Sequence, residues 1–527
     1  MVSEGVEIEK KYDVGESAEV PLLTDMPGVE RVGDPRTATL EAVYFDTDRH
    51  TLASRRITLR RRTGGTDAGW HLKLPPESSP DTSAGADTDS APQQRRELHE
   101  PLGQPDVVPD RLMAHLRAYL RGDSVAPVVR LETERTTYPL YAEDGTHLAD
   151  LLDDLVNAEL LAAGDGPGST QHWREWELEL VHGSPDLFSA AAAVLAEAGA
   201  KPSEHRSKLA RALAAAPGQG ATDIAVPAVP EPDRKSPAAA VVTAYLAEQI
   251  QEILVHDAGV RLEEPEAVHD MRSAARRARS ALSAYRRLYD AVTVRRLRDE
   301  LRLLGRLLGE PRDAQVMLDR LRGHMEDLPA EDAAAARKGR LEKELGDTLD
   351  AGYRKLQRAL LSERYYRLLD DLESFRDHPP VRPDGASSGR KIAGKAVNKA
   401  AKRLRRSHRG AMDARRGAPH ETALHQVRKN AKKLRHVAES ARPVHGKRAA
   451  KVAKAAHRQQ QALGDLHDSV IARDLLAGCA AASGVPEPVA SAYVTLKTRQ
   501  VQLAAAAEKQ YLKAHRKSKK RLKAGVL

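Results

Sequence analysis

The stretch His269-Asp-Met-Arg272-Ser-Ala-Ala-Arg276-Arg-Ala-Arg279 recurs 156 residues later as His425-Gln-Val-Arg428-Lys-Asn-Ala-Lys432-Lys-Leu-Arg435. Each residue of an α-helix advances by about 100°, so a His followed by cations three, seven and ten residues later occupies about one quadrant of the helix surface. Each stretch therefore lines one helix face with a His and three cations. Stacked like charges repel one another, so the pattern indicates a site for a strongly anionic ligand.

A second motif follows each basic stretch after about forty residues, as Leu308-Gly-Glu-Pro-Arg312-Asp313 and as Leu463-Gly-Asp-Leu-His467-Asp468. Two motifs that recur at the same spacing indicate an internal duplication. The surrounding sequence is rich in Ala, Leu, Arg, Lys and Glu with helical periodicity, and a Pro- and Gly-rich break at 378–390 divides it. We expect an all-α domain over 237–520, made of two pseudo-symmetric four-helix bundles at about 237–377 and 391–520.

The length of 527 residues requires more than one domain, and the charge is unevenly distributed. Residues 1–220 hold 23 Lys or Arg and 37 Asp or Glu, whereas residues 221–527 hold 61 and 38. Two halves of opposite sign indicate two domains with different partners. The sequence contains no apolar run long enough for a membrane span and no secretory signal, and its single Cys479 excludes a disulfide framework. We expect a cytoplasmic protein without a membrane partner.

The N-terminal half, 1–215, is predicted to be an antiparallel β-domain because short segments with period-two patterns alternate with Gly, Pro and Asp. The predicted strands are 6–14, 38–45, 57–62, 69–74, 95–100, 128–140 and 173–181, with helical pieces near 109–121 and 184–199. Residues 75–94 are expected to form a flexible insertion. Residues 216–236 are expected to form a Pro-rich linker to the helical half. The fold class is therefore α+β, multidomain.

Charged residues alternate along the outer predicted strands. Glu7, Glu9 and Lys11 share one strand face, and Glu175, Glu177 and Glu179 share another. The strands between them supply basic residues: Arg60, Arg62, His71, Lys73, Arg96 and Arg135. Any half-exposed sheet shows some alternating charge. Carboxylates on the outer strands and cations on the middle ones together favour a closed sheet with a polar interior, suited to a divalent cation and a phosphate chain.

The two basic helices and the two Leu-Gly motifs resemble the CHAD family, named for conserved histidines in an α-helical domain. The resemblance covers about 236–520 and implies binding of inorganic polyphosphate. Association with polyphosphate granules in the cell is part of this expectation. It assigns this role to eight residues: His269, Arg272, Arg276, Arg279, His425, Arg428, Lys432 and Arg435. Nucleic acid is the alternative ligand, but aromatic residues that could stack on bases are almost absent from the basic faces.

The N-terminal half resembles the CYTH family of triphosphate tunnel metalloenzymes over about 3–215. The matching residues begin with Glu7-Ile-Glu9-Lys-Lys11 and continue through Tyr44-Phe-Asp46-Thr47, Trp70-His-Leu-Lys73 and Ser207-Lys208. The resemblance implies Mg²⁺ or Mn²⁺ ligands at Glu7, Glu9, Glu177 and Glu179, joined by Asp153 or its neighbour Asp154. It also implies phosphate-binding catalytic residues at Lys11, Arg60, Arg62, Lys73, Arg135 and Lys208.

These resemblances predict a metal-dependent triphosphatase that hydrolyses tripolyphosphate to phosphate and pyrophosphate, fused to a polyphosphate-binding module. One ion is expected at Glu7, Glu9 and Glu179, and a second near Glu177 and Asp153. Three alternatives stay open. The tunnel could act as an adenylyl cyclase or thiamine triphosphatase, the protein could be a non-catalytic polyphosphate-granule protein, or the helical half could coat nucleic acid.

Overall fold

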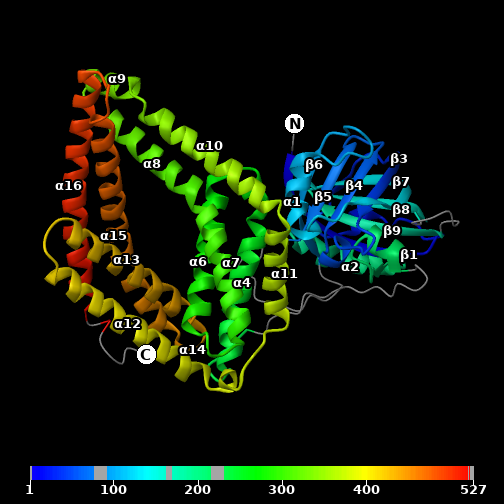
Figure 1. The fold of residues 1–527 in the computed structure, drawn as a ribbon. Helices are drawn as coiled ribbons and strands as arrows, with labels where there is room; N and C mark the ends of the chain where they lie inside the picture. The colour runs from blue at the N-terminus through cyan, green and yellow to red at the C-terminus, as the bar shows by residue number, and fades with distance from the viewer. Residues whose placement is uncertain (1–2, 76–91, 162–168, 215–230, 520, 523–526) are drawn as a thin grey trace. The chain divides into compact units, whose positions relative to one another are not determined.

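The structure is a computed structural model that describes residues 3–75, 92–161, 169–214, 231–519, 521–522 and 527. It divides into two compact units, Met1–Ala228 and Val229–Leu527 (Figure 1). The first unit is a β-barrel with helices and the second is entirely helical in its long elements. Most of the predicted insertion at 75–94 and most of the predicted linker at 216–236 lie outside the described residues.

Eight long antiparallel strands close the barrel. In the sheet the order is β1, β6, β5, β4, β3, β7, β8 and β9, and β9 pairs again with β1. The strand bounds are β1 Ser3–Val14, β2 Arg31–Val32, β3 Arg36–Asp46, β4 Thr58–Thr63, β5 Gly69–Leu74, β6 Gln93–Glu100, β7 Ala126–Tyr141, β8 His147–Leu160, β9 Thr170–Leu180 and β10 Lys201–Pro202. Because the sheet closes, alternate side chains of every long strand face a common interior.

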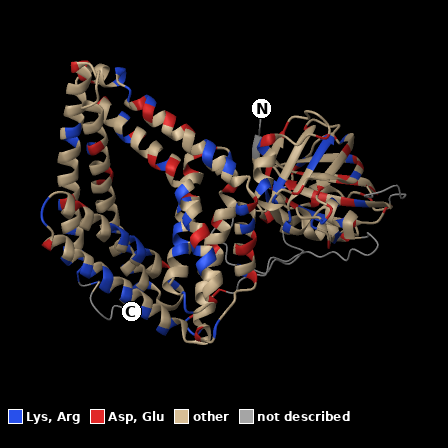
Figure 2. Cartoon of the chain, in the orientation of Figure 1, with Lys and Arg blue, Asp and Glu red and all other residues tan. Residues whose placement is uncertain are grey.

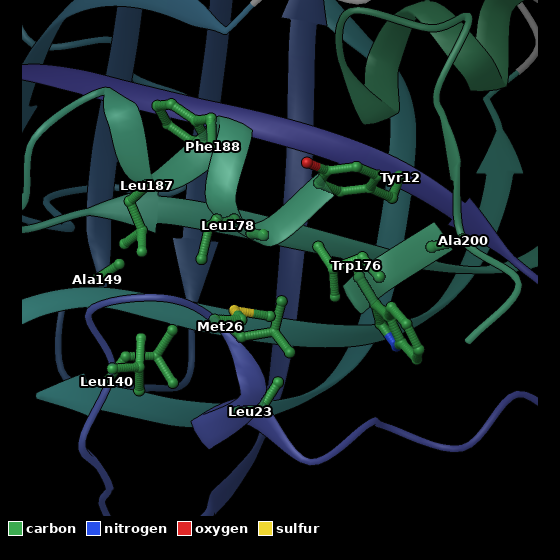
Figure 3. Packing of buried hydrophobic residues seen from close by; sticks show 14 residues of the cluster. Tyr12, Leu23, Met26, Leu140, Ala149, Trp176, Leu178, Leu187, Phe188 and Ala200 are labelled. Carbon is green, nitrogen blue, oxygen red and sulfur yellow. The ribbon is translucent and has the colours of Figure 1, made fainter. Parts of the chain in front are cut away.

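Two hydrophobic clusters of this half lie outside the barrel wall. On one side, Tyr12, Trp176 and Leu178 pack against Leu187 and Phe188 of helix α2 (Asp186–Glu197) (Figure 3). The segment around the short helix η1 (Leu23–Asp25) completes this cluster. On another side, helix α1 (Asp110–Leu120) packs on β4, β5 and β6 together with Leu52 and Ile57, which flank the turn η2 (Ala53–Arg55). Apolar packing outside leaves the barrel interior for charged side chains.

Helix α3 (Lys208–Ala214) closes one end of the barrel. Its Leu209 and Ala212 pack in one buried cluster with Tyr44, Val156 and Trp173. Strand register places all three of these partners on the interior face, because Tyr44 is opposite Arg60 and Val156 is opposite Trp173. The tunnel is therefore closed by apolar contacts at this end, and Lys208 enters the charged interior from it.

The helical half contains helices α4 to α16. Their bounds are α4 Ala238–Val255, α5 Asp257–Arg261, α6 Pro265–Ala284, α7 Ala291–Leu307, α8 Gly309–Glu326, α9 Ala330–Lys338, α10 Leu341–Leu360, α11 Glu363–Asp377, the turn η3 Pro383–Ala386, α12 Gly389–Asp413, α13 Ala418–Glu439, α14 Arg442–His445, α15 Lys447–Ala480 and α16 Glu487–Ser518. The predicted break at 378–390 falls between α11 and α12.

The two halves of this region are related by pseudo-symmetry, as the duplicated sequence predicted. Helices α12 and α13 correspond to α4 and α6, and the single helix α15 spans the length that α7 and α8 share in the first repeat. Helix α16 likewise corresponds to α10 and α11. Ser280 and His436, which occupy equivalent positions 156 residues apart, contact each other at 3.1 Å. Contact between equivalent residues is expected where a two-fold relation passes between two repeats.

One helical stretch among the described residues, Ala238–Arg261, is long and apolar enough to cross a membrane by length and composition. Of its most apolar window, 61% is buried inside the protein. Helix α4, which makes up most of the stretch, packs against α6, α11 and α12. The apolar composition of this stretch is therefore explained by its packing inside the helical bundle.

Sequence reasoning missed strand β8. Its sequence, His-Leu-Ala-Asp-Leu-Leu-Asp-Asp-Leu-Val-Asn-Ala-Glu-Leu, is poor in the β-branched and aromatic residues that mark strands. Both neighbours, β7 and β9, pair with it along most of its length. Tertiary pairing thus overrides a composition that favours a helix.

Candidate active site and anion-binding groove

The interior of the barrel is a charged cavity that encloses about 580 Å³ of empty space including its mouth. Its lining is built mainly from charged side chains with one tyrosine and two hydroxyl residues: Glu7, Glu9, Lys11, Tyr44, Thr58, Arg60, Arg62, Asp67, Lys73, Arg95, Glu97, Arg135, Glu177, Glu179, Ser207 and Lys208. Seven of these residues are cationic and six are carboxylates. Opposite charges in nearly equal number allow the cavity to exist without a ligand.

The acids and bases of the tunnel pair with one another. Lys11 contacts Glu9 at 2.8 Å and also reaches Glu177 across to β9. Lys73 donates to Glu7 at 2.5 Å, and Arg95 donates to Glu9. Although burial opposes ionisation, Lys11 and Arg95 lower the pKa of Glu9 to about 2. The carboxylate is therefore ionised throughout the physiological pH range.

A second cluster of carboxylates lies near the closed end. Oxygen atoms of Asp154, Glu175 and Glu177 lie within 4.8 Å of one another, close enough to hold one cation. The ammonium of Lys208 contacts all three, at 2.8, 2.7 and 2.8 Å. Arg135 adds a two-bond contact to Asp154 at 2.7 and 2.6 Å. In this structure the lysine supplies the positive charge that the cluster requires.

Two features of the tunnel fit a divalent cation near the mouth. The Glu7 side chain is 9% exposed, and its Oε2 is buried without a hydrogen-bond partner among the described residues. Burial, together with the neighbouring Glu7 and Glu9, raises the pKa of Glu179 to about 7. Carboxylate oxygens such as these are the donors that Mg²⁺ or Mn²⁺ prefers.

In the helical half, four of the eight predicted anion-binding residues lie close enough for their charges to act on one another. They come from α6 of the first repeat and α13 of the second, and this set is called the central groove below: Arg272, Arg276, Arg428 and Lys432. Burial and the charges of Arg276, Arg428 and Arg272 lower the pKa of Lys432 to about 7. Burial and the charge of Arg272 lower the pKa of Arg276 to about 10. Cations lower one another's pKa when the fold holds them close together, and a bound anion would relieve their repulsion.

The Leu-Gly motifs position the arginines of the central groove. Asp313 accepts from Arg272 at 2.7 Å, across from α8 to α6. A side chain at Gly309 would meet the Arg272 guanidinium at 3.3 Å, so the glycine leaves room for it. Gly464 stands in the corresponding place beside Arg428, at 3.8 Å. The lack of a side chain therefore makes room for an arginine at Gly309, whereas a side chain at Gly464 would make only an ordinary contact.

Comparison with known proteins bears out both resemblances. The CYTH domain model matches residues 6–213, and the CHAD domain model matches residues 244–477. Two proteins of Mycobacterium tuberculosis strains, the uncharacterized proteins MT2285 and Rv2226, are each 36% identical over 530 residues, with 97% of this chain and 96% of theirs covered. The chain belongs to the CYTH and CHAD families. The similarity to these two relatives extends over both domains of this CYTH–CHAD protein.

Two solved structures show weaker likeness. PptA from Streptomyces chartreusis is 22% identical, with a TM-score of 0.45, 53% of this chain and 100% of that chain covered. The putative adenylyl cyclase HpAC1 from Hippeastrum, described as having a dominant triphosphatase activity, is 17% identical with a TM-score of 0.22, 39% of this chain and 94% of that chain covered. Likeness at these TM-scores does not bear on the reaction of this protein.

The predicted tunnel residues of the CYTH half line the cavity with one exception. The exception is Asp153, which lies outside the barrel wall with two bonds of 2.8 and 2.7 Å from Arg174 and one of 3.1 Å from Trp176. Its neighbour Asp154 faces inward. The reason is strand alternation: Asp153 is opposite Trp176, an outer core residue, and Asp154 is opposite Glu175. The tunnel aspartate is therefore Asp154.

Three residues that face the tunnel were not assigned from the sequence: Arg95, Glu97 and Glu175. Arg95 and Glu97 face inward on β6, whereas Arg96 was expected there. All three residues Glu175, Glu177 and Glu179 face inward, although only the last two were assigned to a metal. Strand β6 begins at Gln93, inside the predicted flexible insertion at 75–94, so the insertion was predicted too long and the phase of the strand was not readable. His71, bonded to Glu97 at 2.9 Å, lies in the adjoining pocket at the mouth.

In the CHAD half, the residues of each predicted basic row do not all contact the same neighbours. Arg279 lies towards Arg302 and Arg298 of α7, and Arg435 contacts Glu439 at 2.7 Å. His425 stacks near His467 with ring centres 4.2 Å apart, and burial and the charge of His467 lower its pKa to about 4. The histidines thus flank the central groove as neutral side chains near neutral pH. Some side chains of one helix face therefore lie near residues of their own repeat, and others lie near residues of the other repeat.

Proposed function

We propose that the tunnel hydrolyses tripolyphosphate to phosphate and pyrophosphate with Mg²⁺ or Mn²⁺, and that the helical half binds inorganic polyphosphate. The family places this chain among triphosphate tunnel enzymes, which depend on a metal. The observation that carries the narrower proposal is the lining of the cavity: seven cations and six carboxylates surround the space, and Tyr44 is the one aromatic side chain in the lining that the structure describes.

The pairing in the tunnel suggests how it accepts its substrate. Lys11, Lys73 and Arg95 neutralise Glu7 and Glu9 when no ligand is present. A metal–triphosphate complex brings both signs of charge, so the carboxylates can turn to the metal while the lysines and arginines turn to phosphoryl oxygens. Exchange of one set of ion pairs for another avoids leaving a buried charge unpaired, which would cost several kcal/mol.

Each group has a place in this proposal. Glu7, Glu9 and Glu179 would hold one ion, and Asp154 with Glu175 and Glu177 would hold a second once Lys208 turns to a phosphate. A bound divalent ion supplies charge neutralisation and lowers the pKa of water. The arginines Arg60, Arg62 and Arg135 would stabilise the charge that spreads over the phosphoryl oxygens during transfer. Apolar closure by α3 excludes water from that end of the tunnel.

The decisive experiment measures phosphate release from tripolyphosphate, ATP and thiamine triphosphate by the full chain with Mg²⁺ or Mn²⁺. Tripolyphosphate is expected to be the best of the three substrates. Lys11→Gln is expected to lose activity, whereas Lys10→Gln on the outer face of the same strand is expected to keep it. Pyrophosphate and cyclic AMP formed from ATP, or no turnover of any substrate, would refute the proposal.

Polyphosphate binding by the helical half follows from the central groove of Arg272, Arg276, Arg428 and Lys432. Replacement of Arg276 and Lys432 by Ala is expected to weaken binding of long-chain polyphosphate at physiological salt. The matched control replaces Arg337 and Lys338, two exposed cations of α9, with the same change in net charge. Equal loss in both variants would mean that net charge alone attracts the polymer. Location in the cytoplasm, at polyphosphate granules, is part of the same proposal.

A further inference from the structure

Helix α12 carries a row of cations that neither the tunnel nor the central groove uses. Its exposed members are Lys391, Lys395, Lys399, Lys402, Arg406 and Arg409, spaced by three or four residues and therefore on one helix face. The row is about 27 Å long at the helical rise of about 1.5 Å per residue. No carboxylate occurs on this helix before its last residue, Asp413. Figure 2 shows the Lys and Arg positions along α12.

This row is costly to the fold because like charges three or four residues apart destabilise a helix. Exposed helices usually relieve such repulsion with acidic residues in the neighbouring turn. None of the six forms an ion pair with a carboxylate among the residues that the structure describes. A solvated surface does not require an uninterrupted row of this length, so the row points to an anionic partner.

A pocket beside α12 strengthens this reading. It encloses about 970 Å³ of empty space, including its opening, and lies where α12 and α13 meet the end of α6. Five cations line it, without a carboxylate: Arg286, Arg287, Lys399, Arg403 and Lys433. Lys399 belongs to both the row and the pocket. Burial together with Arg403, Arg298 and Lys399 lowers the pKa of Lys433, as expected where cations gather without counter-charge.

The pocket is separate from the central groove because the two lie on different sides of α13. Lys432 is close to Arg276 and Arg428, whereas the next residue, Lys433, is close to Arg403 and Lys399. Consecutive helical side chains point about 100° apart. The helix thus presents one lysine to each site.

We propose that this pocket and the row along α12 form a second site for inorganic polyphosphate, which binds chains too long for the central groove alone. The inference rests on polyphosphate binding by the helical half. A long unbranched anion suits an extended row that opens into a pocket. The row itself contains no aromatic residue on which a nucleic-acid base could stack. Tripolyphosphate is too short to use the row, so this site serves the polymer and not the tunnel substrate.

The test compares Lys399→Glu/Arg403→Glu with Arg337→Glu/Lys338→Glu in the full chain. Both pairs are exposed and change the net charge equally. Binding of polyphosphate fractions of several defined lengths is measured over a series of salt concentrations, beside single-stranded DNA of equal charge. The α12 variant is expected to bind long chains at least about tenfold more weakly and with a shallower salt dependence, because fewer counterions are released. Short chains and tripolyphosphate hydrolysis are expected to be unchanged.

Other outcomes separate the possible failures. An equal effect of the α9 and α12 pairs, or a loss that is the same for short and long chains, overturns the second site. Weaker DNA binding with unchanged polyphosphate binding assigns the row to nucleic acid and also overturns it. A third variant, Arg272→Glu/Arg276→Glu, tests the central groove. If this variant no longer binds polyphosphate while the α12 variant still binds chains of all lengths, the proposed function stands and the second site is refuted. If the unmodified chain does not bind polyphosphate, the proposed function itself fails.

Discussion

Asp153 and Asp154 are consecutive in sequence and lie on opposite faces of β8. Asp154 is fully buried in the tunnel beside Arg135 and Lys208, and Asp153 pairs with Arg174 outside the wall. The pair therefore offers a test in which the same chemical change is made in and out of the site.

Asp154→Asn is expected to lower phosphate release from tripolyphosphate by about 10²-fold or more, because a buried carboxylate of the charged site is lost. Asp153→Asn is expected to keep the turnover rate and to lower the free energy of unfolding by about 1–3 kcal/mol, because Arg174 loses its partner. Steady-state kinetics and urea unfolding of both variants measure this. Loss of turnover in Asp153→Asn with native stability would contradict the assignment.

Chelation of divalent ions is expected to abolish hydrolysis without unfolding the protein. The reason is that Lys11, Lys73 and Lys208 form ion pairs with the tunnel carboxylates and can neutralise them. Activity and near-ultraviolet circular dichroism are followed together while chelator is added and Mg²⁺ is then restored. A loss of the dichroism signal along with activity would show instead that the ion is required for folding.

Polyphosphate binding is expected to weaken as the pH rises from 7 to 9. The pKa of Lys432 is about 7 in the free protein, so the neutral amine predominates above that pH. A bound polyanion favours the ammonium and raises this pKa, so binding takes up a proton in this range. Calorimetry in buffers of different ionisation enthalpy measures the uptake. Lys432→Arg retains its charge and is expected to remove most of the dependence; an unchanged pH profile would assign it to another group.

Gly309→Ala is expected to weaken polyphosphate binding, whereas Gly464→Ala is expected to leave it unchanged. The new methyl group would press on the Arg272 guanidinium at 3.3 Å in the first case and make an ordinary 3.8 Å contact with Arg428 in the second. Gly464 lies inside α15, so its replacement is expected to stabilise the helix by up to about 1 kcal/mol. Thermal unfolding and polyphosphate titration of both variants distinguish movement of Arg272 from damage to the fold.

The parts of the fold that the sequence predicted are those with a strong local pattern. Alternation along β1 and β9 identified the inward acids, and the repeated basic stretches identified the duplication. Strand β8 was missed because its composition favours a helix and only pairing with β7 and β9 makes it extended. The same omission explains why the choice between Asp153 and Asp154 stayed open, since the direction of a side chain follows from the strand's phase.

The charged groups of the helical half were harder to place. Spacing put Arg272, Arg276 and Arg279 on one face, but it could not say which of them meets the other repeat. That depends on the crossing of α6 and α13 at Ser280 and His436, a contact between segments far apart in sequence. The pocket beside α12 also depends on that crossing.

The tunnel lining joins the two ends of its half: Glu7 and Glu9 lie on the first strand, β1, and Lys208 lies on the last helix, α3. During synthesis on the ribosome, the charged lining therefore stays incomplete until nearly the whole half has been made. The full set of charged side chains comes together only when α3 packs against the end of the barrel.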